Sequence, residues 1–327
     1  LHCACQTIRL FGFMALSPLT AGVNLATDSH PLLVISACLL GDQVRYDGDH
    51  KRDSLLVGPL ADHVQWLAVC PEVELGLGVP REKIQLEAAS GGIQLVSSRS
   101  RQNLTVPMQQ WAAGWARSHQ ERDICGFVLK SASPSCGVGD ARVWEGKASS
   151  RQGNGLFAEA VVQSFPAIPV ATEKQIQQPG QLEHFLVRVF ARERLLKLLV
   201  EPPGERRRQL LGQEELLLET YQPGSFEELV GIQQERLLVE RHAAVLSRPV
   251  TWKKHRGTLL AACGQLSGNA IRDLEGQLKV SAGDRNWTCW TTELLRQARD
   301  QGNLLASQSY LQPIPVGCLP AEEVPGG

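Results

Sequence analysis

The sequence lacks several features that define whole classes of protein. It contains no Cys-x-x-Cys pair, and its nine cysteines are an odd number spread over 327 residues. A zinc ribbon, a thioredoxin-type redox site and a disulfide-stapled secreted scaffold therefore have no support. We expect the thiols to be mostly free and the protein to reside in a reducing compartment, the cytoplasm.

An excess of charge of one sign is also lacking. The formal net charge is −1; residues 31–180 carry 14 Lys and Arg against 15 Asp and Glu, and residues 181–327 carry 18 of each kind. Neither half offers the broad positive field that non-specific nucleic-acid binding requires. Bulk nucleic acid is therefore disfavoured as a partner, although a single nucleotide could bind in a local pocket.

Long apolar runs are missing as well. Hydrophobic residues make up 43% and charged residues 20%, with a mean hydropathy of −0.14, which excludes a disordered chain, a collagen-like fibre and a polytopic membrane protein. Residues 10–26 superficially resemble a secretory signal, but they contain Pro18 and are too few for a membrane span. We interpret residues 1–30 as a leader of doubtful structure, a translated upstream stretch with the true start at Met14.

The length is typical of two domains, each able to bury its own core. The composition changes at residues 175–181, QIQQPGQ, which are polar with Pro and Gly and so are typical of a linker. We expect an α/β domain over residues 31–174, a helical domain over residues 182–315 and a tail over residues 316–327.

The first domain alternates short apolar runs with helical patterns. Strands are expected at residues 31–41, 67–69, 93–97, 124–131 and 167–172, and helices at the start of 55–69 and over 107–122 and 155–165. Parallel strands that are buried on both faces have nearly continuous apolar sequences. The pattern therefore predicts a mostly parallel, Rossmann-like α/β sheet with helices on both faces.

Beyond the linker, the pattern indicates helices only. Apolar residues recur at three- and four-residue spacing in five stretches: residues 182–200, 206–221, 225–247, 251–266 and 286–302. The second domain is therefore expected to be all-α. Its heptad-like stretches are too short and interrupted for a long coiled coil.

Three cysteines are expected at equivalent places in the sheet. Cys38 follows the first strand, Cys70 follows the second, and Cys136 lies a few residues after the strand at 124–131. Because open α/β sheets bind ligands outside the carboxyl ends of their strands, the fold can bring these thiols together. From spacing alone, burial as small hydrophobic residues is slightly favoured over metal binding. Three other cysteines are expected to be structural: Cys125, Cys263 and Cys289.

Polar side chains accompany each of the three cysteines. Glu72 lies in the loop of the second cysteine, and Lys130 and Ser133 precede the third. Loops beyond a sheet edge that carry such groups are typical of active sites. A solvated charged turn is the simpler interpretation of residues 41–53, and a turn residue that bonds its own backbone is the simpler interpretation of Ser133. The loop after the first cysteine adds Arg45, Tyr46 and Lys51.

Several motifs carry a family resemblance. SACLLGDQVRYDGDHKRD, VCPEVELGLGVPRE, LKSASPSCGVGDARVW and GLFAEAV, in this order, resemble the thiouracil desulfidase (TudS) family over about residues 31–173. Residues 182–315 resemble, less sharply, a helical YbgA-like domain through LSRPVTWKKH and SYLQPIP. This second half departs from the pattern at residues 220–229, where TYQPGSFEEL stands in place of the usual His- and Lys-bearing segment. In the first half, Asp49 stands where a glycine is usual.

The resemblance implies a cofactor and a reaction. The cofactor is a 4Fe–4S cluster held by Cys38, Cys70 and Cys136, with a fourth iron that has no protein ligand and can act as a Lewis acid. The reaction is hydrolytic removal of sulfur from a thiolated pyrimidine, thiouracil or 4-thiouridine monophosphate, with release of hydrogen sulfide and no net redox change. The expected partner is therefore a small molecule, with no membrane partner.

Residue roles follow from the same resemblance. Glu72 is expected to act as general acid or base, and Ser133 to relay a proton or to attack covalently. Basic and aromatic side chains are candidates for gripping a nucleotide phosphate or the pyrimidine. These candidates are Arg45, Tyr46, Lys51 and Lys130.

Two other functions stay open. A non-catalytic iron–sulfur protein that senses a sulfur metabolite or a nucleotide would bind its ligand tightly and release no sulfide. A zinc protein would hold one metal ion with the same three cysteines and a water molecule, and metal analysis would then find no iron. The sequence gives no indication of the oligomeric state.

Overall fold

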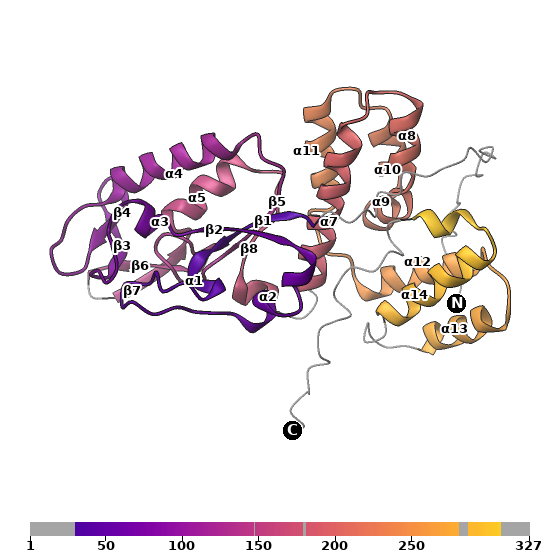
Figure 1. Cartoon of the computed structure of the whole chain (residues 1–327), viewed down its shortest axis with the longest axis horizontal. Helices are drawn as coiled ribbons and strands as arrows, with labels where there is room; N and C mark the ends of the chain where they lie inside the picture. Colours follow the sequence, from indigo (N-terminus) through magenta and orange to yellow (C-terminus); the bar gives the residue numbers. More distant parts are fainter. Residues whose placement is uncertain (1–29, 147, 179–180, 281–286, 309–327) are drawn as a thin grey trace, which may run out of the picture.

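The computed structural model describes residues 30–146, 148–178, 181–280 and 287–308 (Figure 1). An α/β half is followed along the chain by a helical half, and the two lie side by side with helix α7 (Gln181–Leu199) at their junction. Apart from residue 30, the predicted leader lies outside the described residues, as does the predicted tail. No helix in these described ranges is long and apolar enough to span a bilayer.

Four parallel strands form the first sheet, sheet A. Their order is β2 (Gln65–Val69), β1 (Leu32–Ser36), β5 (Ile124–Leu129) and β8 (Val170–Thr172). The α/β class and the parallel sheet are thus confirmed. All six residues of β5 are buried, as expected for an interior strand covered on both faces. Because β1 lies between β2 and β5, the carboxyl ends of these three strands are neighbours at one edge.

Helices cover both faces of sheet A. One face packs against α4 (Thr105–His119) and α5 (Leu156–Ser164), and the other against α7. Phe127 of β5 faces the first layer, whereas Phe185 and Val189 of α7 form the second. A Cβ atom at Gly126 would lie 2.9 Å from Cγ2 of Val189. The glycine therefore allows α7 to approach the strand closely.

Helix α7 belongs to two hydrophobic cores. Leu182 and Leu186 pack into the core of sheet A, whereas Ala191 and Leu198 pack among the helices of the second half. A helix that is apolar on more than one side is expected to be buried between layers. The linker at 175–181 therefore marks a change of sequence pattern, and the helix that follows it still completes the α/β layers. The predicted domain boundary stays a prediction.

A second sheet, sheet B, lies beside the first and was not expected from the sequence. Its strands have the order β4 (Gly92–Ser97), β3 (Ile84–Ala89), β6 (Ala141–Glu145) and β7 (Ala148–Gly153). Residues 93–97 form a strand as predicted, but their assignment to the parallel sheet is wrong, because β4 pairs antiparallel with β3. Strands β3 and β6 mix buried with more exposed residues, so they lack the continuous apolar runs of sheet A.

Short helices lie in the segments after strands β1, β2 and β8 of sheet A. They are α1 (Ala37–Leu40), α2 (Ser54–Val57), the 3-10 turn η1 (Ala61–His63), α3 (Pro71–Glu74) and α6 (Glu173–Ile176). The helix predicted at the start of residues 55–69 is therefore only a single turn. Three of the short helices, α1, α3 and α6, begin within two residues of a strand's end and so lie at the carboxyl edge of the sheet.

The second half is helical throughout its described part, as predicted. Its helices are α8 (Glu205–Gly212), α9 (Glu215–Tyr221), α10 (Ser225–Val230), α11 (Glu235–Val245), α12 (Trp252–Cys263), α13 (Asn269–Val280) and α14 (Trp287–Asp300), followed by the 3-10 turn η2 (Leu304–Ser307). Each of the long helices predicted over 206–221 and 225–247 is in fact two helices. Helix α13 was not predicted.

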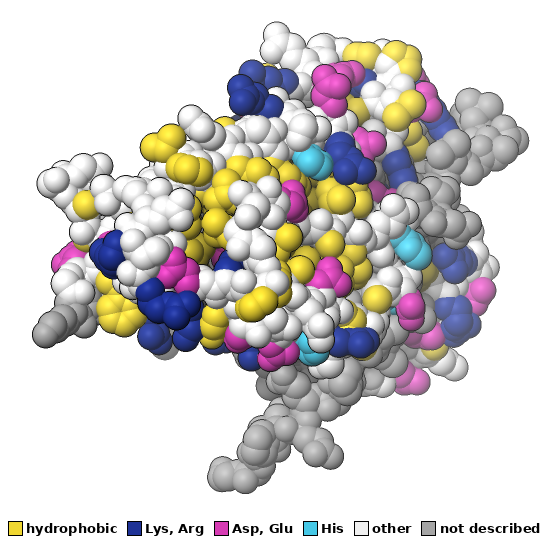
Figure 2. All heavy atoms as spheres, turned by 60° about the vertical axis from the view of Figure 1, so that its left-hand side comes forward, with side chains coloured by type: hydrophobic (Ala, Val, Ile, Leu, Met, Phe, Trp, Pro, Cys, Tyr) yellow, Lys and Arg dark blue, Asp and Glu magenta, His cyan; other side chains and the backbone are white. Residues whose placement is uncertain are grey.

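Charged groups of both signs are spread over the surface. Figure 2 shows hydrophobic side chains near the middle of one face, with Lys, Arg, Asp and Glu side chains interspersed around them. This distribution agrees with the near-zero net charge of the chain.

Candidate active site

The three predicted cysteines lie at the carboxyl ends of three adjacent strands. Cys38 lies in α1 directly after β1, Cys70 directly after β2 where it precedes α3, and Cys136 in the loop after β5. All three thiols are free. The sequence-based placement at one sheet edge is therefore confirmed.

Contacts join the loops that carry these cysteines. The thiol of Cys70 lies 3.8 Å from the carbonyl oxygen of Val44, in the loop after Cys38. The backbone N–H of Arg81 donates to the carbonyl oxygen of Tyr46, at 2.9 Å, and so ties the segment after α3 to that same loop. These two contacts bind the first and second cysteine loops to each other.

A further hydrogen bond connects the second loop to the third. Ser135 donates its hydroxyl to Oε1 of Glu72, with 3.1 Å between the oxygens. Ser135 is fully buried and immediately precedes Cys136. The three loops therefore form one connected structure around the thiols.

The loop that carries Cys136 is built around Ser133. The Ser133 hydroxyl oxygen accepts hydrogen bonds from the backbone N–H groups of Ser135, at 3.2 Å, and Cys136, at 3.1 Å. Its carbonyl oxygen accepts from Gly137 N–H at 2.9 Å. Ser133 is thus a turn residue that binds the nearby backbone, which was the simpler of the two interpretations of its sequence. Its hydroxyl group can still donate its own proton. Whether Ser133 also takes part in chemistry stays a prediction.

Two backbone features hold this loop in a tight conformation. Ala132 has a φ angle of +54°, in the left-handed region that non-glycine residues rarely adopt. Gly155, at the start of α5, packs directly on the loop: a Cβ atom there would lie 2.4 Å from the carbonyl carbon of Ser135 and 2.8 Å from the nitrogen of Cys136. Only glycine permits this approach, so α5 supports the third cysteine from behind.

The thiols influence one another electrostatically. Burial, together with the smaller effect of the neighbouring Cys70, raises the pKa of Cys38 to about 11. Burial also raises the pKa values of Cys70 and Cys136, and at Cys136 the nearby Glu72, Cys38 and Cys70 add to the effect. A bound metal cation would offset both the burial and the mutual repulsion, because a coordinating thiol is deprotonated.

Glu72 has a charged partner that sequence reasoning missed. Arg81 donates from Nε to Oε2 of Glu72 at 3.0 Å, and its Nη2 donates to the same oxygen. The Arg81 side chain is 6% exposed and the Glu72 side chain is 16% exposed. Arg81 lies in the second motif, VCPEVELGLGVPRE, nine residues after Glu72. Its position in this motif was the one signal in the sequence that could have identified it as a site residue. The carboxylate is therefore held from both oxygens, by Arg81 and by Ser135.

Lys130 is also paired, with a residue that the sequence analysis did not single out. Its Nζ atom forms an ion pair with Glu173 and donates to the hydroxyl of Ser131 at 2.8 Å and to the carbonyl oxygen of Ser131 at 3.2 Å. Glu173 is 6% exposed and also accepts the backbone N–H of Ser131 at 2.7 Å. All three ammonium protons therefore have partners within the protein.

Three candidates for substrate binding, Arg45, Tyr46 and Lys51, lie in the loop after Cys38, and their surroundings differ. Arg45 lies with its guanidinium carbon 5.3 Å from the ring centroid of Tyr46, and Lys83 approaches the same ring at 4.8 Å. Both contacts are cation–π geometries. Lys51 is exposed, and its backbone N–H donates a hydrogen bond to the carbonyl oxygen of Cys38. Lys83, from outside this loop, was missed by the sequence analysis.

The remaining described cysteines are distant from this edge. Cys125 is buried inside β5 and Cys263 is buried in α12, in agreement with the structural role expected for both. Cys289 lies in α14, and the predictions for it stay untested.

The donor set consists of cysteine thiols, the ligands that hold iron–sulfur clusters. No group of three or more His, Cys, Asp or Glu side chains in the described part of the chain is arranged to hold one ion. Around zinc, thiolate sulfurs all lie about 2.3 Å from the same metal. In an iron–sulfur cluster each cysteine binds its own iron, so the thiols stand farther apart. Three free thiols that approach from separate strands fit this second arrangement.

Known proteins resemble the α/β half of the chain. Residues 33–173 match the family described as 2-thiouracil desulfurase. The Bacillus subtilis (strain 168) protein described as uncharacterized protein YbbK is 28% identical over 140 residues, which are 41% of this chain and 91% of the relative. A solved structure described as a 4Fe–4S-dependent thiouracil desulfidase, TudS, is 32% identical, covers 45% of this chain and 93% of the other, and gives a TM-score of 0.37.

Proposed function

Residues 33–173 belong to the 2-thiouracil desulfurase family, and from this premise we propose that the protein removes sulfur hydrolytically from a thiolated pyrimidine. Water supplies the oxygen that replaces sulfur on the ring carbon, and sulfur leaves as hydrogen sulfide without net electron transfer. The observation that carries the proposal is that three free thiols meet at the carboxyl edge of sheet A, in loops that contact one another.

The proposed cofactor is a 4Fe–4S cluster held by Cys38, Cys70 and Cys136. The relative TudS, 32% identical in sequence, is described as dependent on such a cluster. When bound through three cysteines, the cluster supplies an iron without a protein ligand, a Lewis acid suited to a soft thiocarbonyl sulfur. Because such an iron is open to oxidants, we place the protein in a reducing compartment, the cytoplasm.

Glu72 is the proposed general acid–base residue. It lies two residues after Cys70, and hydrogen bonds to Arg81 and Ser135 fix both of its oxygens. A carboxylate held in this way can take a proton from the attacking water and return it to the departing sulfur. Arg81 orients the group and balances its charge.

Ser133 has a narrower proposed role. Its hydroxyl oxygen accepts two backbone N–H groups, so its lone pairs are engaged, while its proton can be donated toward the site. This arrangement supports donation or relay of a proton more than covalent attack, since a nucleophile needs an available lone pair.

The substrate contacts are proposed for the loop after Cys38. Tyr46 and the guanidinium of Arg45 offer flat surfaces for a pyrimidine ring, and the exposed Lys51 can reach a phosphate if the substrate is a nucleotide. Lys130 is a weaker candidate for binding a phosphate, because Glu173 and Ser131 engage its ammonium group. Its positive charge instead supports the Cys38 thiolate, whose pKa it lowers.

Sulfide release from 4-thiouracil and 4-thiouridine monophosphate tests the proposal. The full chain is reconstituted with iron and sulfide without oxygen, and wild type is compared with Glu72→Gln. We expect the variant to keep its iron and to lose at least about a hundredfold in turnover. Glu87→Gln is the matched control, because Glu87 is also paired with an arginine, Arg101, but lies in sheet B.

Each other outcome contradicts the proposal in a distinct way. Tight binding of the thiolated compounds without sulfide release would make the protein a sensor. Zinc in place of iron would make it a zinc protein. Full turnover in Glu72→Gln would remove Glu72 from the mechanism.

A further inference from the structure

A buried hydroxyl group lies next to the proposed cluster ligands. Ser36 is the last residue of β1 and comes two positions before Cys38. It precedes helix α1, but its side chain does not cap that helix. The residue is 2% exposed, so its hydroxyl group needs partners inside the protein. The sequence analysis did not single it out, because it ends the apolar run of the first strand.

The hydroxyl group of Ser36 has two partners from the third cysteine segment. Its oxygen accepts a hydrogen bond from the backbone N–H of Lys130, the first residue after β5, at 2.9 Å. The same side chain forms a hydrogen bond with the sulfur of Cys136. Burial raises the pKa of this thiol, and the bond with Ser36 opposes the rise. A cysteine that binds a metal has lost its proton, so Ser36 is then the donor in this bond.

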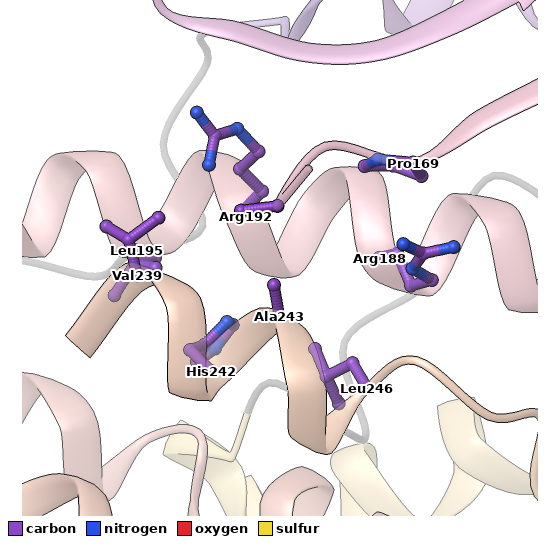
Figure 3. A pocket seen from close by; sticks show the side chains of 9 residues that line it. Pro169, Arg188, Arg192, Leu195, Val239, His242, Ala243 and Leu246 are labelled. Atoms are coloured by element: carbon purple, nitrogen blue, oxygen red, sulfur yellow. The ribbon is translucent and has the colours of Figure 1, made fainter. Parts of the chain in front are cut away.

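Side chains from other elements fix both ends of β5. At its amino end, Arg192 of α7 donates from Nε to the carbonyl oxygen of Ile124, at 2.8 Å. Figure 3 shows Arg192 extending from α7 away from α11. At the carboxyl end, Ser36 binds the N–H of Lys130. The strand that leads into the third cysteine loop is therefore held in place, and the hydroxyl group of Ser36 is held with it.

The three sulfurs differ in their electrostatic support. Cys70 precedes α3, and its sulfur accepts hydrogen bonds from backbone N–H groups of that helix. Cys38 lies near the positive charges of Lys130 and Arg45. The support of Cys136 is a side-chain hydroxyl group. A substitution can remove this group without altering any of the three proposed ligands.

We propose that Ser36 is a positioning residue of the cluster site, whose hydroxyl group donates to the Cys136 sulfur and draws electron density away from the iron that this sulfur binds. The inference rests on the proposed function, because it needs the cluster. Hydrogen bonds to cysteine sulfurs help to set the reduction potential of a cluster, since they stabilise its more negative, reduced form. The same loss of electron density makes the iron a stronger Lewis acid.

The reduction potential of the reconstituted cluster in the full chain tests this role. Ser36→Ala should keep its iron and shift the potential to a more negative value. Ser36→Thr retains a hydroxyl group and should keep the potential of wild type. Ser97→Ala is the matched control, because Ser97 is also a buried serine at the end of a strand, 3% exposed, but belongs to β4 of sheet B.

Resonance Raman spectra of the same proteins measure the effect on the sulfur itself. A hydrogen bond to a cysteine sulfur weakens the bond between that sulfur and iron. Ser36→Ala should therefore move iron–cysteine stretching bands to higher frequency, whereas Ser36→Thr and Ser97→Ala should leave them in place. A changed potential with unchanged bands would show that alanine acts through the released N–H of Lys130, and this result would overturn the inference.

The other outcomes separate this inference from the proposed function. An unchanged potential in Ser36→Ala, or the same shift in Ser36→Thr, would overturn the inference and leave the proposed function intact. Loss of iron from Ser36→Ala would overturn it too, because the hydroxyl group would then be required for binding the cluster rather than for adjusting it. Iron missing from wild type would refute the proposed function, and the inference with it.

Discussion

Ser135 donates its hydroxyl to Glu72 across 63 positions of the sequence, with 3.1 Å between the two oxygens. The first residue precedes Cys136 and the second follows Cys70, so one hydrogen bond joins the proposed general acid–base group to the third cysteine loop. The other oxygen of the carboxylate is bound by Arg81. The position of Glu72 therefore depends on two loops at once.

Replacing Ser135 by alanine removes this link without touching a thiol. We expect Ser135→Ala to keep its iron content and to lose about fivefold in kcat, because one hydrogen bond contributes about 1 kcal/mol. Steady-state sulfide release and an iron assay measure the two quantities. Ser118→Ala is a suitable control, since Ser118 also donates to a neighbour but lies at the end of α4. An unchanged kcat would show that Glu72 does not need this bond.

Gly155 is predicted to be essential for the third cysteine loop. A methyl group there meets the backbone of Ser135 and Cys136, which cannot move without opening the turn. We expect Gly155→Ala to lower the free energy of unfolding by about 1–3 kcal/mol or more and to reduce the iron bound on reconstitution. Gly114→Ala serves as control, because Gly114 lies in α4 with open space around it, and alanine favours a helix. Equal iron binding by the two variants would contradict this role.

Glu173 is predicted to hold Lys130 and Ser131 in place. Glu173→Gln leaves a poorly solvated ammonium group without its counter-ion, and breaking a buried pair costs about 3–5 kcal/mol of unfolding free energy. Urea unfolding measures this loss. The double variant Lys130→Met, Glu173→Leu removes both charges and should recover much of the stability. If the double variant were as unstable as the single one, the electrostatic explanation would be wrong.

The sequence predicted the site's framework because that framework rests on local signals. Short apolar runs identified β1, β2 and β5, and the three cysteines lie within a few residues of their carboxyl ends, so the parallel sheet placed the thiols at one edge. The partners of the candidate side chains were not predictable in this way. Arg81 reaches Glu72 through a loop, and Glu173 reaches Lys130 from another strand end, 43 positions away. Such pairs exist only once the chain is folded.

Sheet B and the helix breaks were missed for a related reason. Strand β3 pairs with β4 on one side and with β6, more than fifty residues later, on the other, and the strands have only partly apolar sequences. Residues 206–221 carry a helical pattern throughout, yet the chain leaves the helix at Gln213 and Glu214. There the buried Glu214 binds Arg194 of α7, so a tertiary contact accompanies the break.

Stability should decrease in acid because His242 is buried in neutral form. Its pKa is about 4 in the folded protein and about 6.5 in an unfolded chain, so between these values the unfolded state binds more protons. The contribution of His242 is therefore complete above pH 6.5 and is lost as the pH falls toward 4, at a cost of about 3 kcal/mol. Urea unfolding across this range should show a steeper loss for wild type than for His242→Leu. Parallel curves for the two proteins would contradict the assignment.

The most direct test of the central claim is a count of iron and acid-labile sulfide per chain after reconstitution without oxygen. Wild type should bind about four of each, as a 4Fe–4S cluster requires. Cys38→Ala, Cys70→Ala and Cys136→Ala should each lose most of this content, while Cys125→Ala, which alters a buried thiol inside β5, should retain it. Full iron content in any of the first three variants, or no iron in wild type, would contradict the proposed cluster site.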